Sequence, residues 1–135
     1  MKVKGFDGKE TPWKLNLYNQ QKPNPSKPHL LCRELLRKIY PNDQILEEVF
    51  LPGSNGLYAD FYLPLRRLMV EPGGSQHDQY VGHFHNYNKL NFYKSKGRDA
   101  LKRQWCELNH ITLIVLSTAE DIDEWRDKII KRASS

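Results

Sequence analysis

The stretch DFYLPLRRLMVEPGGSQH, from Asp60 to His77, carries the clearest prediction of secondary structure in this chain. Its first part, up to Glu71, has the pattern of a β-hairpin, because two apolar segments flank the turn sequence PLRR. Asp60 lies in the first segment and Glu71 closes the second, directly before a Pro-Gly-Gly break. The pattern therefore predicts two antiparallel strands with a carboxylate at the same end of each.

A third strand is predicted before this hairpin. ILEEVFL (45–51) and LYADFYL (57–63) are separated by the turn sequence PGSNG, and LMVE (68–71) follows PLRR. A hairpin loop made of PGSNG pairs Leu51 with Leu57, and PLRR likewise pairs the two leucines on either side of it. The three segments thus predict an antiparallel meander with a defined register.

This register places three carboxylates side by side. Counting outward from the turns puts Glu48 opposite Asp60 and Asp60 opposite Glu71. Opposed residues share one face of a sheet with Cβ atoms about 5 Å apart, so these charges repel unless a cation lies between them. Mg²⁺ or Mn²⁺ suits such a site, with Asp60, Glu48 and Glu71 as ligands. Two alternatives stay open: the acids are solvated on an outer face, or a one-residue change in loop length brings in Glu47 instead of Glu48.

The other segments predict helices around the sheet. Apolar residues recur with helical spacing in three segments: about 28–40, 98–109 and about 119–132. In the second of these, RDALKRQWCELN, the residues predicted to face inward are Ala100, Leu101, Trp105 and Leu108. ITLIVLS (111–117) predicts a buried strand, and residues 78–97 fit either a helix or a long loop.

The order of these elements predicts an α/β fold. Its mixed β-sheet consists of the three-strand meander plus a further buried strand, and helices flank it. Residues 1–27 are rich in lysine and proline, and we expect them to form a basic extended N-terminal arm. Residues 28–135 are then expected to form one domain, which is what a chain of 135 residues allows.

Composition narrows the class of protein. The net charge of +5 favours an anionic partner such as nucleic acid. The longest apolar run is far shorter than the roughly 20 residues of a membrane span. The two cysteines, Cys32 and Cys106, do not form a disulfide framework, so we expect a reducing, cytoplasmic location.

Four motifs resemble one nuclease family in their order and spacing: LPG (51–53), ADFYLP (59–64), LMVEPGGSQH (68–77) and GRDALKRQWCELN (97–109). They are similar to the PD-(D/E)XK superfamily, in the branch of the very short patch repair (Vsr) endonucleases, and most of all to phage homing endonucleases named for an EDxHD motif. The resemblance implies a Vsr-like, restriction-endonuclease-like fold and a divalent-metal-dependent DNA endonuclease. This chain departs from the pattern at Gly73, where most members carry a lysine. It also lacks the aromatic wedge of the Vsr enzymes, which argues against mismatch repair.

The resemblance also implies roles for single residues. The EDxHD motif falls on Glu48, Asp60, His77 and Asp99. Asp60 is then the direct metal ligand, assisted by Glu48 or Glu71. His77 deprotonates the attacking water, and Asp99 orients the His77 ring. Gln76 hydrogen-bonds the phosphate or a metal-bound water.

Five basic residues flank this site and suit contacts to DNA phosphates: Lys94, Lys96, Arg98, Lys102 and Arg103. A solvated helix face is the alternative for these residues. For the whole chain, the alternative is a basic nucleic-acid-binding module that keeps a degenerate nuclease fold without cutting. The resemblance further implies a phage-encoded protein that acts on double-stranded DNA in the bacterial cytoplasm, and it allows for a separate DNA-recognition domain in a longer protein.

Overall fold

The computed structural model describes residues 1–15, 21–73 and 86–133, and within these it describes residues 86–96 through their backbone. Gln76 and His77 therefore lie outside the described residues. No helix in the described ranges is both long enough and apolar enough to cross a membrane.

A mixed four-stranded sheet forms the centre of the molecule, as predicted. Its strands, in spatial order, are β3 (Leu46–Phe50), β4 (Tyr58–Leu63), β5 (Leu68–Pro72) and β6 (Thr112–Leu116). β3, β4 and β5 are antiparallel neighbours, and β6 joins β5 in parallel. The Leu51 amide donates to the Leu57 carbonyl at 3.0 Å, and Leu63 pairs with Leu68 across the short 3₁₀ turn η1 (Pro64–Arg66). The predicted register of both hairpins is therefore confirmed.

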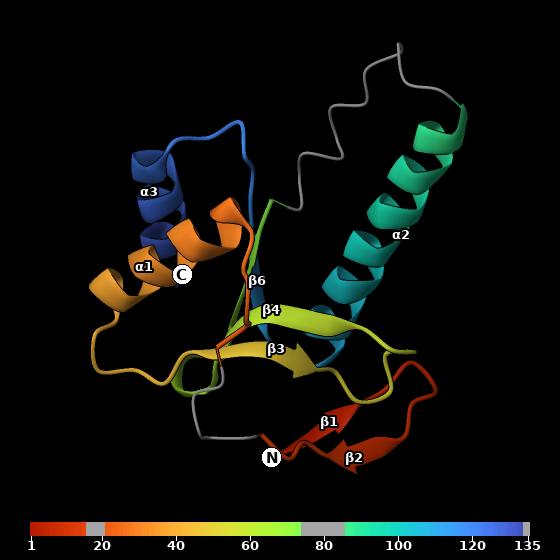
Figure 1. Cartoon of the computed structure of the whole chain (residues 1–135). Helices are drawn as coiled ribbons and strands as arrows, with labels where there is room; N and C mark the ends of the chain where they lie inside the picture. Colours follow the sequence, from red (N-terminus) through yellow and green to blue (C-terminus); the bar gives the residue numbers. More distant parts are fainter. Residues whose placement is uncertain (16–20, 74–85, 134–135) are drawn as a thin grey trace.

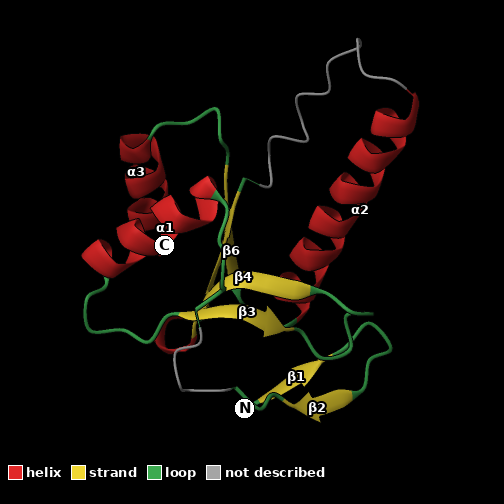
Figure 2. Cartoon of the chain, viewed as in Figure 1, coloured by secondary structure: helices red, strands yellow, loops and turns green. Residues whose placement is uncertain are grey.

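Helices cover both faces of this sheet (Figure 1, Figure 2). α1 (Lys27–Ile39) and α3 (Ile122–Ala133) pack on one face, over a core that includes Phe61, Val70 and Ile114. The C-terminal end of α2 (Asn86–Leu108), with Trp105 and Cys106, packs on the other face, and the chain then continues into β6 (Figure 1). The fold is thus α/β, with α1 and α3 on one side of the strands and α2 on the other.

α1 begins where the sequence indicates. The Ser26 hydroxyl accepts a hydrogen bond from the His29 amide at 3.3 Å, and Pro28 occupies the first turn, where a missing amide hydrogen costs nothing. Cys32, Leu35 and Leu36 follow at helical spacing and are fully or almost fully buried. This arrangement fixes His29 and Arg33 on the inner side of the helix, close to β3.

The N-terminal residues differ from the extended arm that we expected. β1 (Lys2–Lys4) and β2 (Glu10–Pro12) form an antiparallel hairpin that packs against the domain. Val3 is buried, and Trp13, just after β2, is buried against Tyr62 with ring centroids 4.6 Å apart. The two lysines of β1 are exposed, whereas Val3 between them faces the core. The prediction of an extended arm was wrong because it rested on the basic composition and not on this alternation.

α2 agrees with the prediction in part. It begins at Asn86, so the helix alternative left open for residues 78–97 holds from Asn86 onward. Trp105 is fully buried as predicted, and its indole N–H donates to the Pro52 carbonyl at 2.9 Å. Ala100, Leu101 and Leu108 were also predicted to face inward, but they are exposed. The inner side of the helix also carries Lys102, whose ammonium pairs with the carboxyl group of Glu71.

Candidate active site

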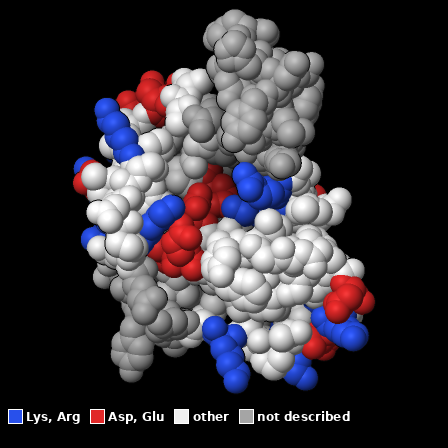
Figure 3. Space-filling view, turned by 45° about the vertical axis from the view of Figure 1, so that its right-hand side comes forward, with Lys and Arg blue, Asp and Glu red and all other residues white. Residues whose placement is uncertain are grey.

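Three acidic residues meet on neighbouring strands, as the register predicted. Glu48 lies between the pairs Glu47–Phe61 and Val49–Ala59, which places it opposite Asp60. Asp60 directly precedes Phe61, whose partner Val70 directly precedes Glu71, so Asp60 lies opposite Glu71. Figure 3 shows acidic side chains gathered at the centre of one face of the molecule, with basic side chains on either side.

Glu71 is the most deeply buried acid of this group, with 5 % of its surface exposed. Its Oε2 accepts a hydrogen bond from the Asp60 amide at 2.9 Å, and its Oε1 lies 2.6 Å from Lys102 Nζ. Burial raises the pKa of Glu71 to about 8, and the negative charge of Asp60 adds to this effect while Lys102 opposes it. The Glu71 carboxyl can therefore exchange a proton near neutral pH, and α2 supplies the positive charge beside it.

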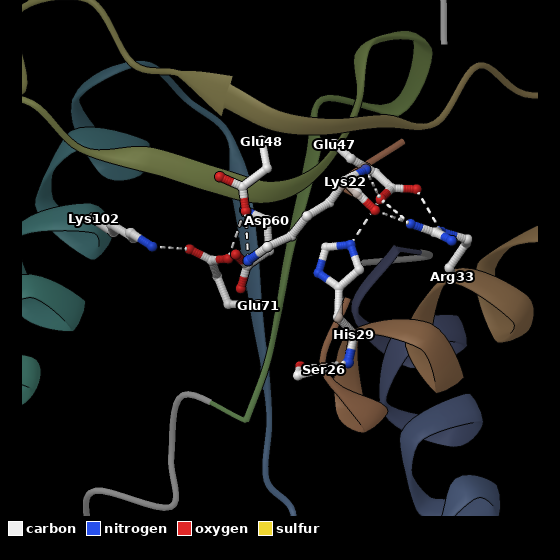
Figure 4. Close-up of polar contacts among 9 residues, drawn as sticks. All are labelled: Lys22, Ser26, His29, Arg33, Glu47, Glu48, Asp60, Glu71 and Lys102. Carbon is white, nitrogen blue, oxygen red and sulfur yellow. Dashed lines mark hydrogen bonds and ion pairs between the residues drawn. The ribbon is translucent and has the colours of Figure 1, made fainter. Parts of the chain in front are cut away.

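Glu48 adopts an unusual backbone conformation in the middle of a strand. Its φ is +53°, in the left-handed region, which costs a residue other than glycine roughly 1–2 kcal/mol. Its carboxylate Oε1 lies 3.0 Å from Lys22 Nζ (Figure 4). Such strain is more frequent at functional sites than elsewhere, and here it accompanies a carboxylate directed into the acidic group.

Glu47, the alternative to Glu48, has a different environment. Its carboxylate accepts from His29 Nε2 at 2.7 Å and from Arg33 Nε at 2.9 Å and Nη2 at 2.8 Å. Burial alone would raise the pKa of Glu47, but hydrogen bonds from Arg33, His29 and the Lys22 amide outweigh burial and lower it. Glu47 is thus held in a buried ionic network with α1, and Glu48 is the residue that joins Asp60 and Glu71.

The other predicted site residues in the described part of the chain lie on α2 and have different surroundings. Arg98 is exposed and Asp99 is partly exposed on α2, and both form contacts of their own. Lys94 and Lys96 belong to α2, but their side chains are outside the described part of the chain. Arg103 lines a pocket with Arg132 and Glu107. Lys102, also predicted to contact phosphate, instead pairs with Glu71 of the acidic group.

Two lysines of the site were not predicted in these roles. Lys22 comes from the segment before α1, and Lys102 was expected to contact DNA. Figure 4 shows the two side chains reaching the carboxylates from opposite sides. A helical pattern that counted Lys102 on the inner side could have identified this lysine, whereas no local pattern marks Lys22. Together they provide positive charge near the acids.

The donor atoms of this site suit a hard divalent cation in part. Carboxylate oxygens are the ligands that Mg²⁺ prefers, and proteins commonly hold it through one or two carboxylates while it keeps several waters. Within the described residues, however, no three His, Cys, Asp or Glu side chains are grouped closely enough to hold a metal ion. Asp60 with Glu71 or Glu48 would therefore be the protein ligands, and Lys22 or Lys102 would have to release one of them.

Known proteins that resemble the chain come from viruses. It is 30 % identical over 116 residues to "Uncharacterized protein 094L" of Frog virus 3, a match that covers 82 % of this chain and 75 % of that protein. The chain therefore belongs to the same family as this Frog virus 3 protein.

A second relative matches over a shorter region. "Uncharacterized protein 307L" of Invertebrate iridescent virus 6 is 45 % identical over 74 residues, which is 52 % of this chain and 37 % of the relative. The chain thus spans little more than a third of the length of that protein. Both relatives are viral proteins, which agrees with the expectation of a virus-encoded protein, and neither is a protein of a bacterial virus by the name of its virus. No protein-family model and no solved structure matches the chain.

Proposed function

We propose that this chain is a divalent-metal-dependent DNA endonuclease domain of the Vsr-like branch of the PD-(D/E)XK superfamily, related to EDxHD homing endonucleases. The observation that carries the proposal is the alignment of Glu48, Asp60 and Glu71 on adjacent strands, with a lysine on either side. Three buried or half-buried acids on one side of a sheet are costly, and a hydrolytic site is a reason to keep them.

The proposed reaction is hydrolysis of a phosphodiester. A water oxygen forms a bond to phosphorus, the bond from phosphorus to the leaving sugar oxygen breaks, and that oxygen gains a proton while the attacking water loses one. A bound Mg²⁺ or Mn²⁺ would make the water more acidic and neutralise charge on the phosphate. Asp60 is the proposed direct ligand, and Glu71 or Glu48 assists.

The chain's own residues supply the remaining chemistry in this proposal. His77 is the proposed base, Asp99 its orienting partner, and Gln76 a hydrogen-bond donor to the phosphate. Lys102 balances the charge of Glu71, because its ammonium lies 2.6 Å from that carboxylate. The basic residues around the site, with the net charge of +5, support binding to double-stranded DNA in the virus-infected cell.

A non-catalytic nucleic-acid-binding module is the second candidate. The observation that favours it is the pairing of both Glu48 and Glu71 with lysines, because a binding protein can neutralise inherited acids in this way. Incubation with supercoiled plasmid separates the two functions. The nuclease relaxes or linearises the plasmid with Mg²⁺ and fails with EDTA or as Asp60→Ala, whereas the binding module shifts the plasmid under all these conditions and never cuts it.

A further inference from the structure

Lys22 is held by its backbone from two sides, although it belongs to a proline-rich connection. Its amide donates to Glu47 Oε1 at 2.9 Å, and its carbonyl accepts from Arg33 Nη2 at 3.0 Å. Glu47 and Arg33 themselves form a bidentate ion pair between β3 and α1. A single residue of an irregular segment is thus fixed relative to both the sheet and the helix.

Glu47 and Arg33, which hold the Lys22 backbone like a clamp, belong to a larger buried network that also includes His29. His29 Nε2 lies 2.7 Å from Glu47 Oε1, and the His29 ring stacks on Phe61 with centroids 4.3 Å apart. The Glu47 side chain is 2 % exposed. Buried ion pairs contribute little net stability compared with apolar residues of the same size, so stability alone is a weak reason for this network. What the network does provide is a fixed position for the backbone of Lys22.

The side chain of Lys22 extends from this clamp to the acidic group. Its ammonium lies 3.0 Å from Glu48 Oε1, and Figure 4 shows the side chain directed toward the carboxylates of the candidate site. It is 39 % exposed, whereas the Lys102 side chain is 17 % exposed and pairs with Glu71. An ammonium has three donors, so Lys22 can keep Glu48 and still reach an anion that arrives from solvent.

We propose that Lys22 binds a phosphate oxygen of the DNA strand at the candidate site, and that Glu47 and Arg33 are positioning residues that hold it there. This inference rests on the proposed function for the identity of its ligand. Lys102 is less suited to bind the phosphate, because its side chain is less exposed and its ammonium pairs with Glu71 at 2.6 Å.

The first test compares Lys22→Met with Lys27→Met, which removes an exposed lysine nearby, in single-turnover cleavage of supercoiled plasmid. Removing one donor to a reacting oxyanion commonly lowers a rate by about 10²–10³. We expect Lys22→Met to lose at least tenfold, with an unchanged melting temperature and no increase in the Mg²⁺ concentration for half-maximal rate. Lys22→Arg should retain more activity than Lys22→Met, and Lys27→Met should cut like the wild type.

A second measurement does not require cleavage. Binding to a short duplex in EDTA, titrated with NaCl, should weaken for Lys22→Met, and the slope of log affinity against log salt should fall by about 1, as for one lost phosphate contact. If the wild type never cuts but this slope falls, the nuclease proposal fails and the phosphate contact stands. If neither the rate nor the slope differs from Lys27→Met, Lys22 is not a substrate contact.

The positioning role has its own readout. Arg33→Lys removes the fixed donor to the Lys22 carbonyl and should lower the cleavage rate in the wild-type background. In the Lys22→Met background it should have no further effect on the rate, because the two residues act through the same ammonium. Equal rate losses in both backgrounds would show that Arg33 does not act through Lys22 and would overturn its positioning role.

Discussion

The backbone amide of Asp60 donates a hydrogen bond to the buried carboxyl of Glu71, at 2.9 Å across β4 and β5. This bond, together with the ion pair to Lys102, fixes Glu71 at the end of β5 while the charge of Asp60 lies beside it. The site therefore combines a well-defined geometry with unfavourable electrostatics.

The first prediction concerns stability against pH. Because the pKa of Glu71 is raised from 4.5 to about 8, the folded protein binds a proton between these values that the unfolded chain has lost. This contribution to stability is present below about 4.5 and is lost as the pH rises through about 8. Glu71→Gln should have nearly wild-type stability at acidic pH and should become progressively more stable than the wild type toward pH 8. Urea unfolding across this range measures the difference, and a difference independent of pH would contradict the prediction.

The second prediction concerns the buried Glu47 network. Arg33→Met leaves the Glu47 carboxylate buried without its bidentate partner, and breaking a buried pair in this way costs roughly 3–5 kcal/mol. Arg37→Met, on the exposed side of the same helix, is the matched control and should change the free energy of unfolding by less than about 0.5 kcal/mol. The double variant Arg33→Met with Glu47→Gln should recover much of the loss. Equal effects of the two arginine variants would show that the pair is not a stabilising contact.

The third prediction concerns the N-terminal hairpin. The Asn109 side chain accepts from the Lys4 amide at 2.7 Å and donates to the carbonyls of Lys4 and Trp105, each at 3.0 Å. Asn109→Ala removes the side-chain partner of the partly buried Lys4 amide and carbonyl, while the Trp105 carbonyl keeps its bond from the Asn109 amide, and we expect a cost of roughly 1–3 kcal/mol. Hydrogen exchange at the Lys4 amide should accelerate more than exchange in β5. Unchanged exchange at Lys4 would indicate that other contacts hold the hairpin.

Much of this architecture could be predicted from the sequence, because it depends on local signals. The turn sequences PGSNG and PLRR fix loop length, and loop length fixes which residues of adjacent strands face each other. The alignment of Asp60 with Glu71 follows from counting residues. The start of α1 likewise follows from Ser26 and Pro28.

The remaining features depend on contacts between distant segments. The predicted inner side of α2 was right at Trp105 but wrong at Leu101 and Leu108, which are apolar but exposed, whereas Lys102 turns inward to contact Glu71. The role of Lys22 depends on a clamp made by β3 and α1, which no pattern around residue 22 indicates. The N-terminal hairpin was missed because lysines on its outer side dominate its composition.

The fourth prediction concerns metal binding. If Asp60 and its neighbours hold a divalent ion, Mg²⁺ or Mn²⁺ should raise the melting temperature, since a ligand at 100-fold excess over Kd adds about 2.7 kcal/mol. Asp60→Asn should melt slightly higher than the wild type without metal, because one repelling charge is gone, and should lose most of the metal-induced increase. NaCl at matched ionic strength should produce a smaller shift in both proteins. Identical responses to Mg²⁺ and to NaCl would rule out a shared metal site.

The most direct measurement is the single-turnover rate at which the wild type nicks supercoiled plasmid in Mg²⁺, compared with the rates of Asp60→Asn and Asp127→Asn. Asp127 is an exposed acid on α3, away from the acidic group, so its variant controls for the loss of one negative charge. We expect Mg²⁺-dependent nicking by the wild type and by Asp127→Asn, and a fall of at least about 10²-fold for Asp60→Asn, as for loss of a group that acts in the transition state. Nicking by Asp60→Asn at the wild-type rate, or no nicking by the wild type, would contradict the assignment of this site as a nuclease centre.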